Sequence, residues 1–437
     1  MDGRRVRPAA LVLLAAVAGL GAALAAVSQE NPPVRVETAR LLPLDIARFG
    51  RPPLRPSTVA AALKRGMKFR DRPSIGSGLT WIGGHEFVGV TDRGPNDDDP
   101  KVVGHEAGVL FPLPRFNPSL VRFRWESGRL TVSAILPIHG SDGRGVTGLP
   151  GRDADADGYD RPGARAPLPP DPRGLDIEGV RRFPDGRYLL AEEYGPSLLV
   201  TTATGEVLKR YLPPSRASQP SAFPVDGQVP EVFARRRANR GFESVALSRD
   251  GRRAWTVVEG PLGPRDDPQF KKSRTVRVLE WDVTDPLKAR VVAEFLLPLS
   301  PPPPGTGQHD VRISDAEWVS ERRLLLVEPA PGRLRLVIAD FAQATNILGR
   351  PEADSLAIDA AEAPLPAMGI TPATTTVIFD NHDLRLIGQD KLEGLTIVSD
   401  REVVVSSDND FGMGDNRTGA RAQLWRLRWP AALFGER

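Results

Sequence analysis

The sequence has 437 residues, and its 42 Gly and 43 Pro make up about 19% of the chain. That share is above the ordinary level of about 12% but below the ~25–30% typical of low-complexity disorder. With 40% hydrophobic and 26% charged residues, the chain has enough apolar material for a large core. These figures exclude a disordered or collagen-like protein and indicate a folded one rich in turns. The absence of Cys excludes disulfides, thiol catalysis and thiolate metal sites.

The N-terminus predicts an export leader over residues 1–26. Three Arg and one Asp within residues 2–8 precede an uncharged apolar run from Ala9 to Val27, and Ala23-Leu24-Ala25 offers a small-residue cleavage motif. We therefore expect a secreted or periplasmic protein with no membrane contact after cleavage. An uncleaved anchor is the minor alternative, since about 18 apolar residues is the lower limit for spanning a bilayer. Without the leader, 55 basic residues face 54 acidic ones, so no basic field predicts nucleic-acid binding.

Short β-rich runs separated by Gly, Pro and Asp turns fill the rest of the chain. One short helix is expected over Ser57–Arg65, with Ser57 as its cap. The clearest repeating unit covers residues 175–212, where four apolar runs alternate with turns such as Pro184-Asp185-Gly186. That pattern is typical of a four-stranded antiparallel meander of about 40 residues, the size of one propeller blade.

Five such units begin near residues 75, 175, 241, 313 and 391. They predict an all-β fold, a β-propeller of four-stranded antiparallel blades, over residues 74–430. Radial closure would also protect the edges of so many short strands. The fifth unit shows only three strands, and residues 34–42, within an N-terminal segment 27–73, are the candidate for a fourth, ring-closing strand. A sixth, degenerate blade stays possible in 139–174 or 351–380.

Acidic residues recur at two fixed positions of the units. Four units carry one at the start of the first strand: Glu178, Glu243, Glu317 and Glu393. All five carry one at the end of the second strand: Asp92, Glu193, Glu259, Glu328 and Asp408. These positions are neighbours in a hairpin, so we expect nine carboxylates to converge on one mouth of the propeller channel.

Carboxylates packed this closely oppose folding unless cations neutralise them. Basic side chains adjoin them in the sequence: Arg93, Arg173, Arg240, Arg312 and Lys391. A ring of oxygen ligands also suits Ca²⁺. The alternative is structural, with each acid capping its own blade through a hydrogen bond from the backbone or an Arg.

Five segments carry a family resemblance: TDRGP (91–95), LDIEGV…PDGRYLLAEEYGPSLL (175–199), NRGFESVALS (239–248), ISDAE with LLLVE (313–328), and KLEGL…SDNDFG (391–412). Together they resemble the phytase-like family with esterase-like activity over roughly residues 70–428. The resemblance implies an exported bacterial β-propeller hydrolase related to calcium-dependent phytases, in which acid-bound Ca²⁺ holds phosphate and activates water. Ser244 departs from the pattern, because a Gly often follows the Glu there, and Pro329 follows Glu328 where a basic residue is usual.

The resulting hypothesis is an exported Ca²⁺-dependent hydrolase of phosphate esters, acting on small molecules as a monomer. The expected catalytic residues are Glu178, Glu193, Glu243 and Glu393, and the expected substrate-binding residues are Arg93, Arg240 and Lys391. The expected metal ligands are Asp92, Glu178, Glu193, Glu243, Glu259, Glu317, Glu393, Asp408 and Asp410. Two rivals stay open: a propeller lactonase or carboxylesterase, and a non-catalytic propeller that binds an envelope partner.

A second calcium site is suggested by Asp153, Asp155 and Asp157, which with Gly158 follow the D-x-D-x-D-G spacing of a calcium loop. Position 12 of that loop is Ala164 rather than Glu, so a full EF-hand is excluded. An ordinary acidic turn is the alternative.

Overall fold

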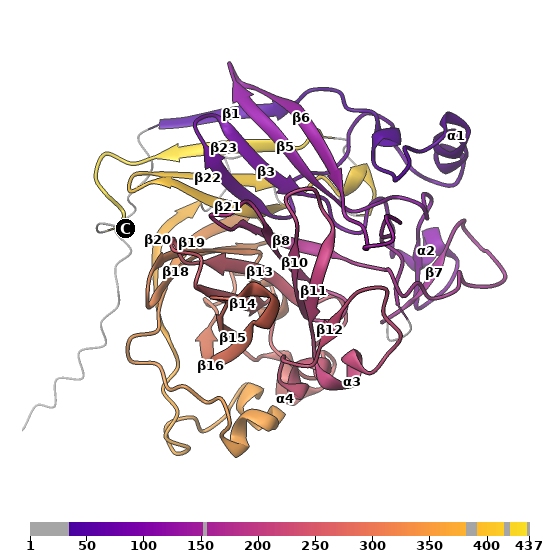
Figure 1. Ribbon diagram of the computed structural model, residues 1–437. Coiled ribbons are helices and arrows are strands. Elements are labelled where there is room, and N and C mark those ends of the chain that lie inside the picture. The colour runs from indigo at the N-terminus through magenta and orange to yellow at the C-terminus, as the bar shows by residue number, and fades with distance from the viewer. Residues whose placement is uncertain (1–34, 152–154, 382–390, 415–419, 435–437) are drawn as a thin grey trace, which may run out of the picture.

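The computed structural model describes residues 35–151, 155–381, 391–414 and 420–434. The predicted leader and Asp153 lie outside these ranges. The described residues are mostly β, and the strands form five four-stranded antiparallel units (Figure 1). Two of these units belong to one eight-stranded sheet, in which Arg40 and Leu41 pair in parallel with Arg129 and Leu130. The prediction of an all-β protein built from such four-stranded units is confirmed.

From the centre outward, the first sheet contains β2 (Leu79–Gly83), β3 (Glu86–Val90), β5 (Ser119–Glu126) and β6 (Arg129–Pro137). The second contains β8 (Ile177–Arg182), β9 (Tyr188–Glu192), β10 (Ser197–Thr201) and β11 (Val207–Tyr211), with the short β12 (Val225–Asp226) at its edge. The third contains β13 (Phe242–Leu247), β14 (Arg253–Val258), β15 (Thr275–Asp282) and β16 (Arg290–Pro298).

The fourth sheet contains β17 (Asp315–Ser320), β18 (Arg323–Ala330), β19 (Arg333–Asp340) and β20 (Thr374–Asn381). The fifth contains β21 (Leu392–Ser399), β22 (Glu402–Ser407), β23 (Gln423–Arg428) and β1 (Arg35–Leu41). The segment predicted as a ring-closing strand therefore forms β1, which pairs antiparallel with β23 from Arg35 opposite Arg428 to Arg40 opposite Gln423.

The innermost strands contact one another in the cyclic order β2, β8, β13, β17, β21 and back to β2. Sheets that surround an axis in this way are the blades of a β-propeller. Within the described ranges no sixth sheet of this kind occurs. Residues 139–174 contribute only β7 (Asp157–Tyr159), which pairs with β4 (Gly108–Leu110), and residues 374–381 form β20.

Helices are short and lie in the connections. They are α1 (Pro56–Lys64), α2 (Pro100–Val103), α3 (Pro214–Ala217) and α4 (Pro268–Lys271). The expected Ser57 cap is wrong: α1 begins at Pro56, and its N-cap Arg55 makes no side-chain cap. Proline suits this position because the first helical N–H has no partner within the helix. No helix in the described part of the chain is both long and apolar enough to cross a bilayer.

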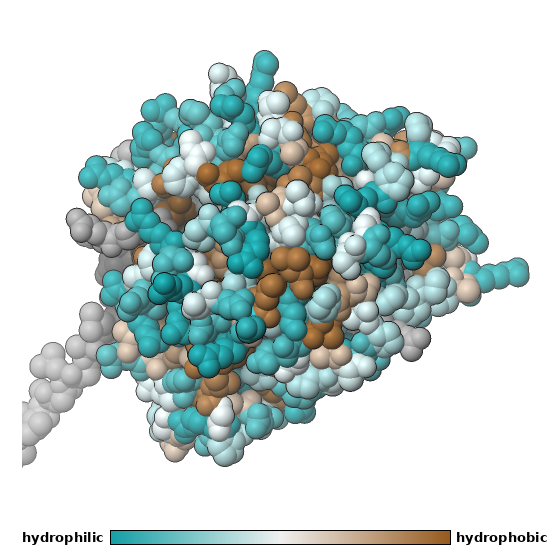
Figure 2. Space-filling view, in the orientation of Figure 1, coloured by the Kyte–Doolittle hydropathy of each residue, from teal (hydrophilic) through white to brown (hydrophobic). Residues whose placement is uncertain are grey.

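Apolar and aromatic side chains hold neighbouring blades together. The ring of Tyr211 in β11 lies 6.0 Å from that of Trp281 in β15, and Phe379 in β20 lies 5.9 Å from Trp429. Both tryptophans are almost fully buried, and aromatic pairs of this kind add to the free energy of burial. At the surface, apolar groups appear as patches between polar side chains (Figure 2).

The two ends of the propeller differ in their loops. At one end the first two strands of each blade are joined by turns of two to five residues, 84–85, 183–187, 248–252, 321–322 and 400–401. At the other end, long connections such as 138–176 and 212–241 lead into the next inner strand. Helix α1 and strand β7 belong to such connections, helix α2 lies in the long connection between β3 and β5, and all three project on the right of Figure 1.

Candidate functional site

The predicted acids gather at the end of the propeller with the long loops because each blade begins with a hairpin. In the second blade Ile177 lies opposite Glu192, and the Glu193 N–H donates to the carbonyl of Asp176 at 2.9 Å. In the third blade the Glu259 N–H donates to the carbonyl of Gly241 at 3.0 Å. The first residues of the inner strand therefore lie beside the last residues of the second strand.

A shift in strand register turns three of the glutamates toward the channel. The pairing of β8 with β9 skips Glu178, that of β13 with β14 skips Glu243, and that of β21 with β22 skips Glu393. A bulge leaves the extra residue unpaired and redirects its side chain. The same local irregularity therefore recurs in three blades.

Glu317 does not join this group, so the prediction of its convergence is wrong. β17 starts without a bulge, and Asp315, Ala316 and Glu317 pair in regular register with β18. The Glu317 carboxylate instead accepts from the Thr396 hydroxyl at 3.1 Å and lies 3.5 Å from the Arg181 guanidinium. Its side chain lines the opposite end of the channel.

Glu328 is also absent from the group. It forms an ion pair with Arg335 on the adjacent strand at 3.0 Å and accepts from the Ser300 N–H at 2.8 Å. For Glu328 the alternative of a purely structural role therefore applies, because its hydrogen bond and ion pair stabilise the blade to which it belongs.

Nine carboxylates form what we call the acidic centre: Asp92, Asp176, Glu178, Glu193, Glu243, Glu259, Glu393, Asp408 and Asp410. All but Asp410 are more than nine-tenths buried. Two overlapping triplets have ligand oxygens within 4.8 Å of one another: Asp176, Glu178 and Glu193, and Glu193, Glu243 and Glu259. Glu193 belongs to both triplets.

Four cationic side chains accompany the centre, and each is paired with its acids. Arg93 lies 3.1 Å from Asp176, and Arg240 and Arg312 lie 2.7 and 3.5 Å from Glu259. Lys391 contacts Glu393 and Asp408, both at 3.1 Å, and also Asp410. Because nine carboxylates face four cations, formal negative charge remains in excess.

The excess charge changes the ionisation of the acids. Burial, followed by repulsion between the carboxylates, raises the pKa values of Glu178 and Glu243 well above their usual range. Burial and the nearby Asp176 and Glu259 raise the pKa of Glu193 to about 8. Asp408 differs: burial opposes its ionisation, but Lys391 and the Ser74 hydroxyl hold its pKa below the usual value.

Several oxygens of the centre have no protein partner. The buried Glu193 Oε1 and Glu393 Oε2 accept no hydrogen bond. Within the described ranges, no hydrogen bond or ion pair reaches the carboxylates of Glu178 and Glu243. Buried polar atoms are rarely left unsatisfied, and carboxylate oxygens are the preferred ligands of Ca²⁺. The donor set therefore fits one or more hard divalent cations.

Of the candidate calcium loop, Asp155 and Asp157 lie within the described residues. Asp155 pairs with Arg236 at 2.7 Å and accepts from the Asn239 N–H at 3.2 Å. Gly158, expected at a sharp turn, lies within the extended β7, and Asp157 is exposed. Since Asn239 also accepts from Arg93 at 2.7 Å, Asp155 instead links the insertion to the edge of the acidic centre.

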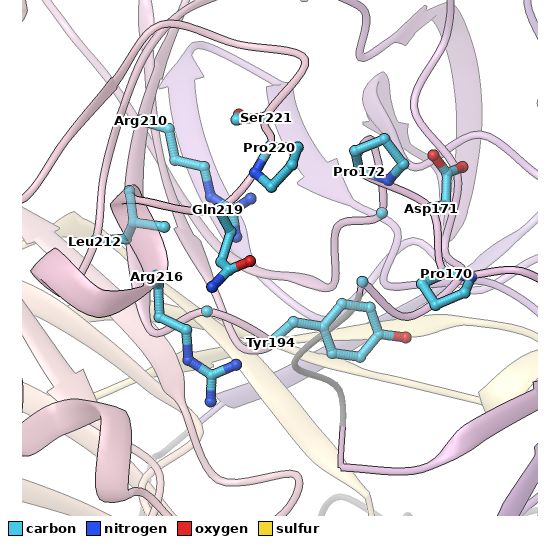
Figure 3. Close-up of a pocket in the computed structure, with 13 residues that line it drawn as sticks. Pro170, Asp171, Pro172, Tyr194, Arg210, Leu212, Arg216, Gln219, Pro220 and Ser221 are labelled. Atoms are coloured by element: carbon cyan, nitrogen blue, oxygen red, sulfur yellow. The ribbon is translucent and has the colours of Figure 1, made fainter.

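A small pocket of about 180 Å³ opens beside the centre, next to Tyr194 and Gly195 (Figure 3). Tyr194 directly follows Glu193, its ring lies 5.9 Å from the Arg93 guanidinium, and its hydroxyl donates to the Gly148 carbonyl at 2.7 Å. Figure 3 shows Arg216, Gln219 and the prolines Pro170 and Pro172 around this ring. The Tyr194 side chain therefore lies between this pocket and the acidic centre.

Sequence reasoning missed Asp176, Tyr194 and Asn239. The spacing of Asp176 and Glu178 in LDIEGV was a usable signal, because alternate strand residues point to the same side. No signal was available for Asn239, whose left-handed backbone (φ 51°) and contact with Arg93 arise from tertiary structure.

Fold and site together define a β-propeller with a buried, cation-deficient carboxylate centre at one channel mouth. The chain belongs to the phytase-like family described as "Esterase-like activity of phytase", whose model matches residues 75–411. The resemblance noted from the sequence motifs is thereby confirmed.

An uncharacterized secreted protein of Arthroderma benhamiae is 28% identical over 156 residues, which are 32% of this chain and 29% of that protein. This chain therefore matches under a third of that relative's length. Among solved structures, a luciferin-regenerating enzyme is 11% identical with a TM-score of 0.36, covering 84% of this chain and 96% of that one. The periplasmic gluconolactonase of Pseudomonas aeruginosa is 13% identical with a TM-score of 0.29, covering 81% and 85%. Likeness at this level carries no conclusion about activity.

Proposed function

We propose that this protein is a five-bladed propeller that acts as an exported, Ca²⁺-dependent hydrolase of phosphate esters. One observation carries the proposal: within the part of the chain that the structure describes, the buried carboxylates of Glu178, Glu193, Glu243 and Glu393 have oxygens without a hydrogen-bond partner. A folded protein rarely retains such charges unless a cation neutralises them. Family membership supports ester hydrolysis, and the secreted relative supports export.

The two triplets that share Glu193 are the residues we expect to hold cations. When bound, Ca²⁺ would supply positive charge for phosphate oxygens and lower the pKa of water. Arg93 and Arg240 keep N–H groups beyond those bonded to acids, since a guanidinium has five donors, and these would orient the substrate. Glu178 and Glu243, whose carboxylates have no hydrogen-bond or ion-pair partner among the described residues, are placed to hold a cation or to accept the proton of the attacking water.

Lys391 fits substrate binding less well than the two arginines. Its ammonium group already contacts three carboxylates, and an ammonium has only three N–H donors. We propose that Lys391 holds Glu393, Asp408 and Asp410 together, and that it contacts phosphate only if a bound cation displaces one of them.

The test is a panel of phosphate monoesters, carboxylate esters and lactones assayed with the purified protein, with Ca²⁺ and after treatment with chelator. We expect phosphate ester hydrolysis that chelation abolishes and added Ca²⁺ restores. Full phosphatase activity in the chelated protein would contradict the proposal. Preferential turnover of uncharged esters or lactones would favour a lactonase or carboxylesterase, and Ca²⁺ binding without any turnover would favour a binding propeller.

A further inference from the structure

The other end of the channel holds a second, larger cavity, distinct from the acidic centre. Its volume is about 1060 Å³, at the upper end of the ~300–1000 Å³ usual for ligand pockets. All five inner strands or the turns that follow them contribute to its wall, together with Ala432 and Phe434 near the C-terminus. We call it the distal cavity.

Arg181 closes the floor of the distal cavity. From β8 its guanidinium donates to the Leu79 carbonyl of β2 at 2.8 Å and crosses to Asp315 of β17 at 3.0 Å. Because β8 and β17 are not neighbours in the ring of inner strands, this side chain spans the channel. The distal cavity is therefore a blind recess, and a ligand within it does not reach the acidic centre through the channel.

The wall of the recess combines aromatic side chains with hydrogen-bonding groups. Trp81 is partly exposed, and its indole N–H donates to the Gly84 carbonyl at 3.1 Å, which fixes the orientation of the ring. Trp318 and Phe434 add two further aromatic side chains. Only Oε2 of Glu317 is engaged, by Thr396 and Arg181; within the described residues its Oε1 accepts no hydrogen bond.

The charges of the wall nearly balance. Three arginines, Arg181, Arg182 and Arg249, face two acids, Glu317 and Asp400, and Asp315 pairs with Arg181 from the floor. A simple anion would be repelled by the acids and a simple cation by the arginines. A purely apolar ligand would leave the Oε1 atom of Glu317 without a hydrogen bond, at a cost in free energy. A neutral ligand with ring faces and many hydroxyl groups satisfies all of these groups, because each hydroxyl both donates and accepts.

We propose that the distal cavity binds a short neutral oligosaccharide, with pyranose rings against Trp81 and hydroxyl groups bonded to Glu317 and Arg182. This inference does not depend on the hydrolase activity, since the two sites lie at opposite ends of the channel. An experiment that rules out saccharide binding would therefore leave the proposed hydrolase activity untouched, and the reverse also holds.

The test is titration of the full-length mature protein with maltotriose, cellotriose and triacetylchitotriose, followed by tryptophan fluorescence and calorimetry. We expect saturable binding of at least one trisaccharide and none of sorbitol, which has no ring face. Trp81→Ala should weaken binding about tenfold, the equivalent of one lost aromatic contact, and Trp81→Phe should restore most of it.

Two further variants keep the test decisive. Glu317→Gln preserves the size of the side chain and should weaken binding, whereas Glu193→Gln in the acidic centre should leave it unchanged. Absence of binding by all three trisaccharides at millimolar concentration, or binding that survives Trp81→Ala with an unchanged melting temperature, would overturn the proposal. Saturable binding of tetramethylammonium with no saccharide binding would instead assign the cavity to cations.

Discussion

At the acidic centre nine carboxylates gather around four cationic side chains, whereas at the other end of the channel Arg181 is matched with Asp315 and Glu317. Both groups are largely buried, but Arg181, Asp315 and Glu317 lie on inner strands, whereas the acidic centre lies where the start of each inner strand meets the end of the second strand. At the distal end the protein supplies the counter-charge itself, and burial raises the pKa of Asp315 only to about 7 despite its complete enclosure, since Arg181 opposes the shift. At the acidic centre the counter-charge is incomplete, so a cation from solution is the missing partner.

The two ends of the channel also differ in the length of their loops. The distal end has turns of two to five residues between the first two strands of each blade, while the acidic end carries the long connections that bring Asn239 and Asp155 to its edge. Variable loops on a rigid scaffold are where functional residues concentrate. Excess buried charge and long loops therefore mark the same end of the molecule.

The largest effect is expected from Arg181→Met, which leaves two buried acids without their cation. Removing one partner of a buried ion pair costs about 3–5 kcal/mol, measurable as a loss of free energy of unfolding in urea. Adding Asp315→Asn and Glu317→Gln should recover part of that loss. Arg187→Met is the matched control, because its pair with Asp185 is largely exposed and such pairs contribute about 1 kcal/mol or less. Equal losses for Arg181→Met and Arg187→Met would contradict the expected contribution of the buried ion pairs at the distal end.

Glu193→Gln tests the acidic end directly. Glu193 belongs to both triplets, so its loss should weaken Ca²⁺ binding by about 100-fold or more. A loss of that size is the upper range for residues that only orient a metal ligand, and a ligand itself should contribute at least as much. Hydrolysis at limiting Ca²⁺ should fall in parallel. Asp185→Asn, in the turn at the distal end of the same blade, is the control and should change neither. Calorimetric titration with Ca²⁺ measures the effect, and unaltered affinity in Glu193→Gln would contradict a shared ligand.

Chelated protein should become less stable as pH rises. The pKa of Glu193 is raised from 4.5 to about 8 in the folded state, so the folded chain holds a proton that the unfolded chain releases. That contribution to stability is complete below pH 4.5 and lost as pH rises through about 8. Added Ca²⁺ should raise the melting temperature most at the alkaline end of this range and should release protons. A melting temperature independent of pH in the chelated protein would argue against the predicted protonation.

The smallest effect is expected from Asp155→Asn. Its pair with Arg236 is partly exposed on the acid side, so we expect a loss of about 1 kcal/mol in stability, the usual scale of one hydrogen bond. Because Asp155 is bonded to Arg236 and Asn239, the number of Ca²⁺ ions bound should not change. A lower Ca²⁺ stoichiometry in this variant would restore the calcium-loop interpretation.

Most of the strands and the pairing of acids within a blade were predictable. The turn Pro184-Asp185-Gly186 connects β8 and β9, and Gly186 has a positive φ of 94° there. Residue types that favour a turn of this kind can be recognised in the sequence. Glu178 and Glu317 look equivalent in the repeats, yet the register shift of β8 falls at Glu178, whereas that of β17 falls between Trp318 and Ser320, after Glu317. Whether a bulge forms at a given residue depends on how the inner strand packs against the neighbouring blades. A local sequence motif does not contain that information.

The sequence by itself located five repeating units, their strand order and the acids that recur in their hairpins, because turn residues and alternating apolar residues act over short distances. Tertiary structure alone decided which acids meet and which are neutralised: Asp315 and Glu317 receive Arg181 from two blades away, and Glu328 receives Arg335. Electrostatic interactions depend on distance and burial in space rather than along the chain. For that reason the placement of charge at the two ends of the channel emerged only with the fold.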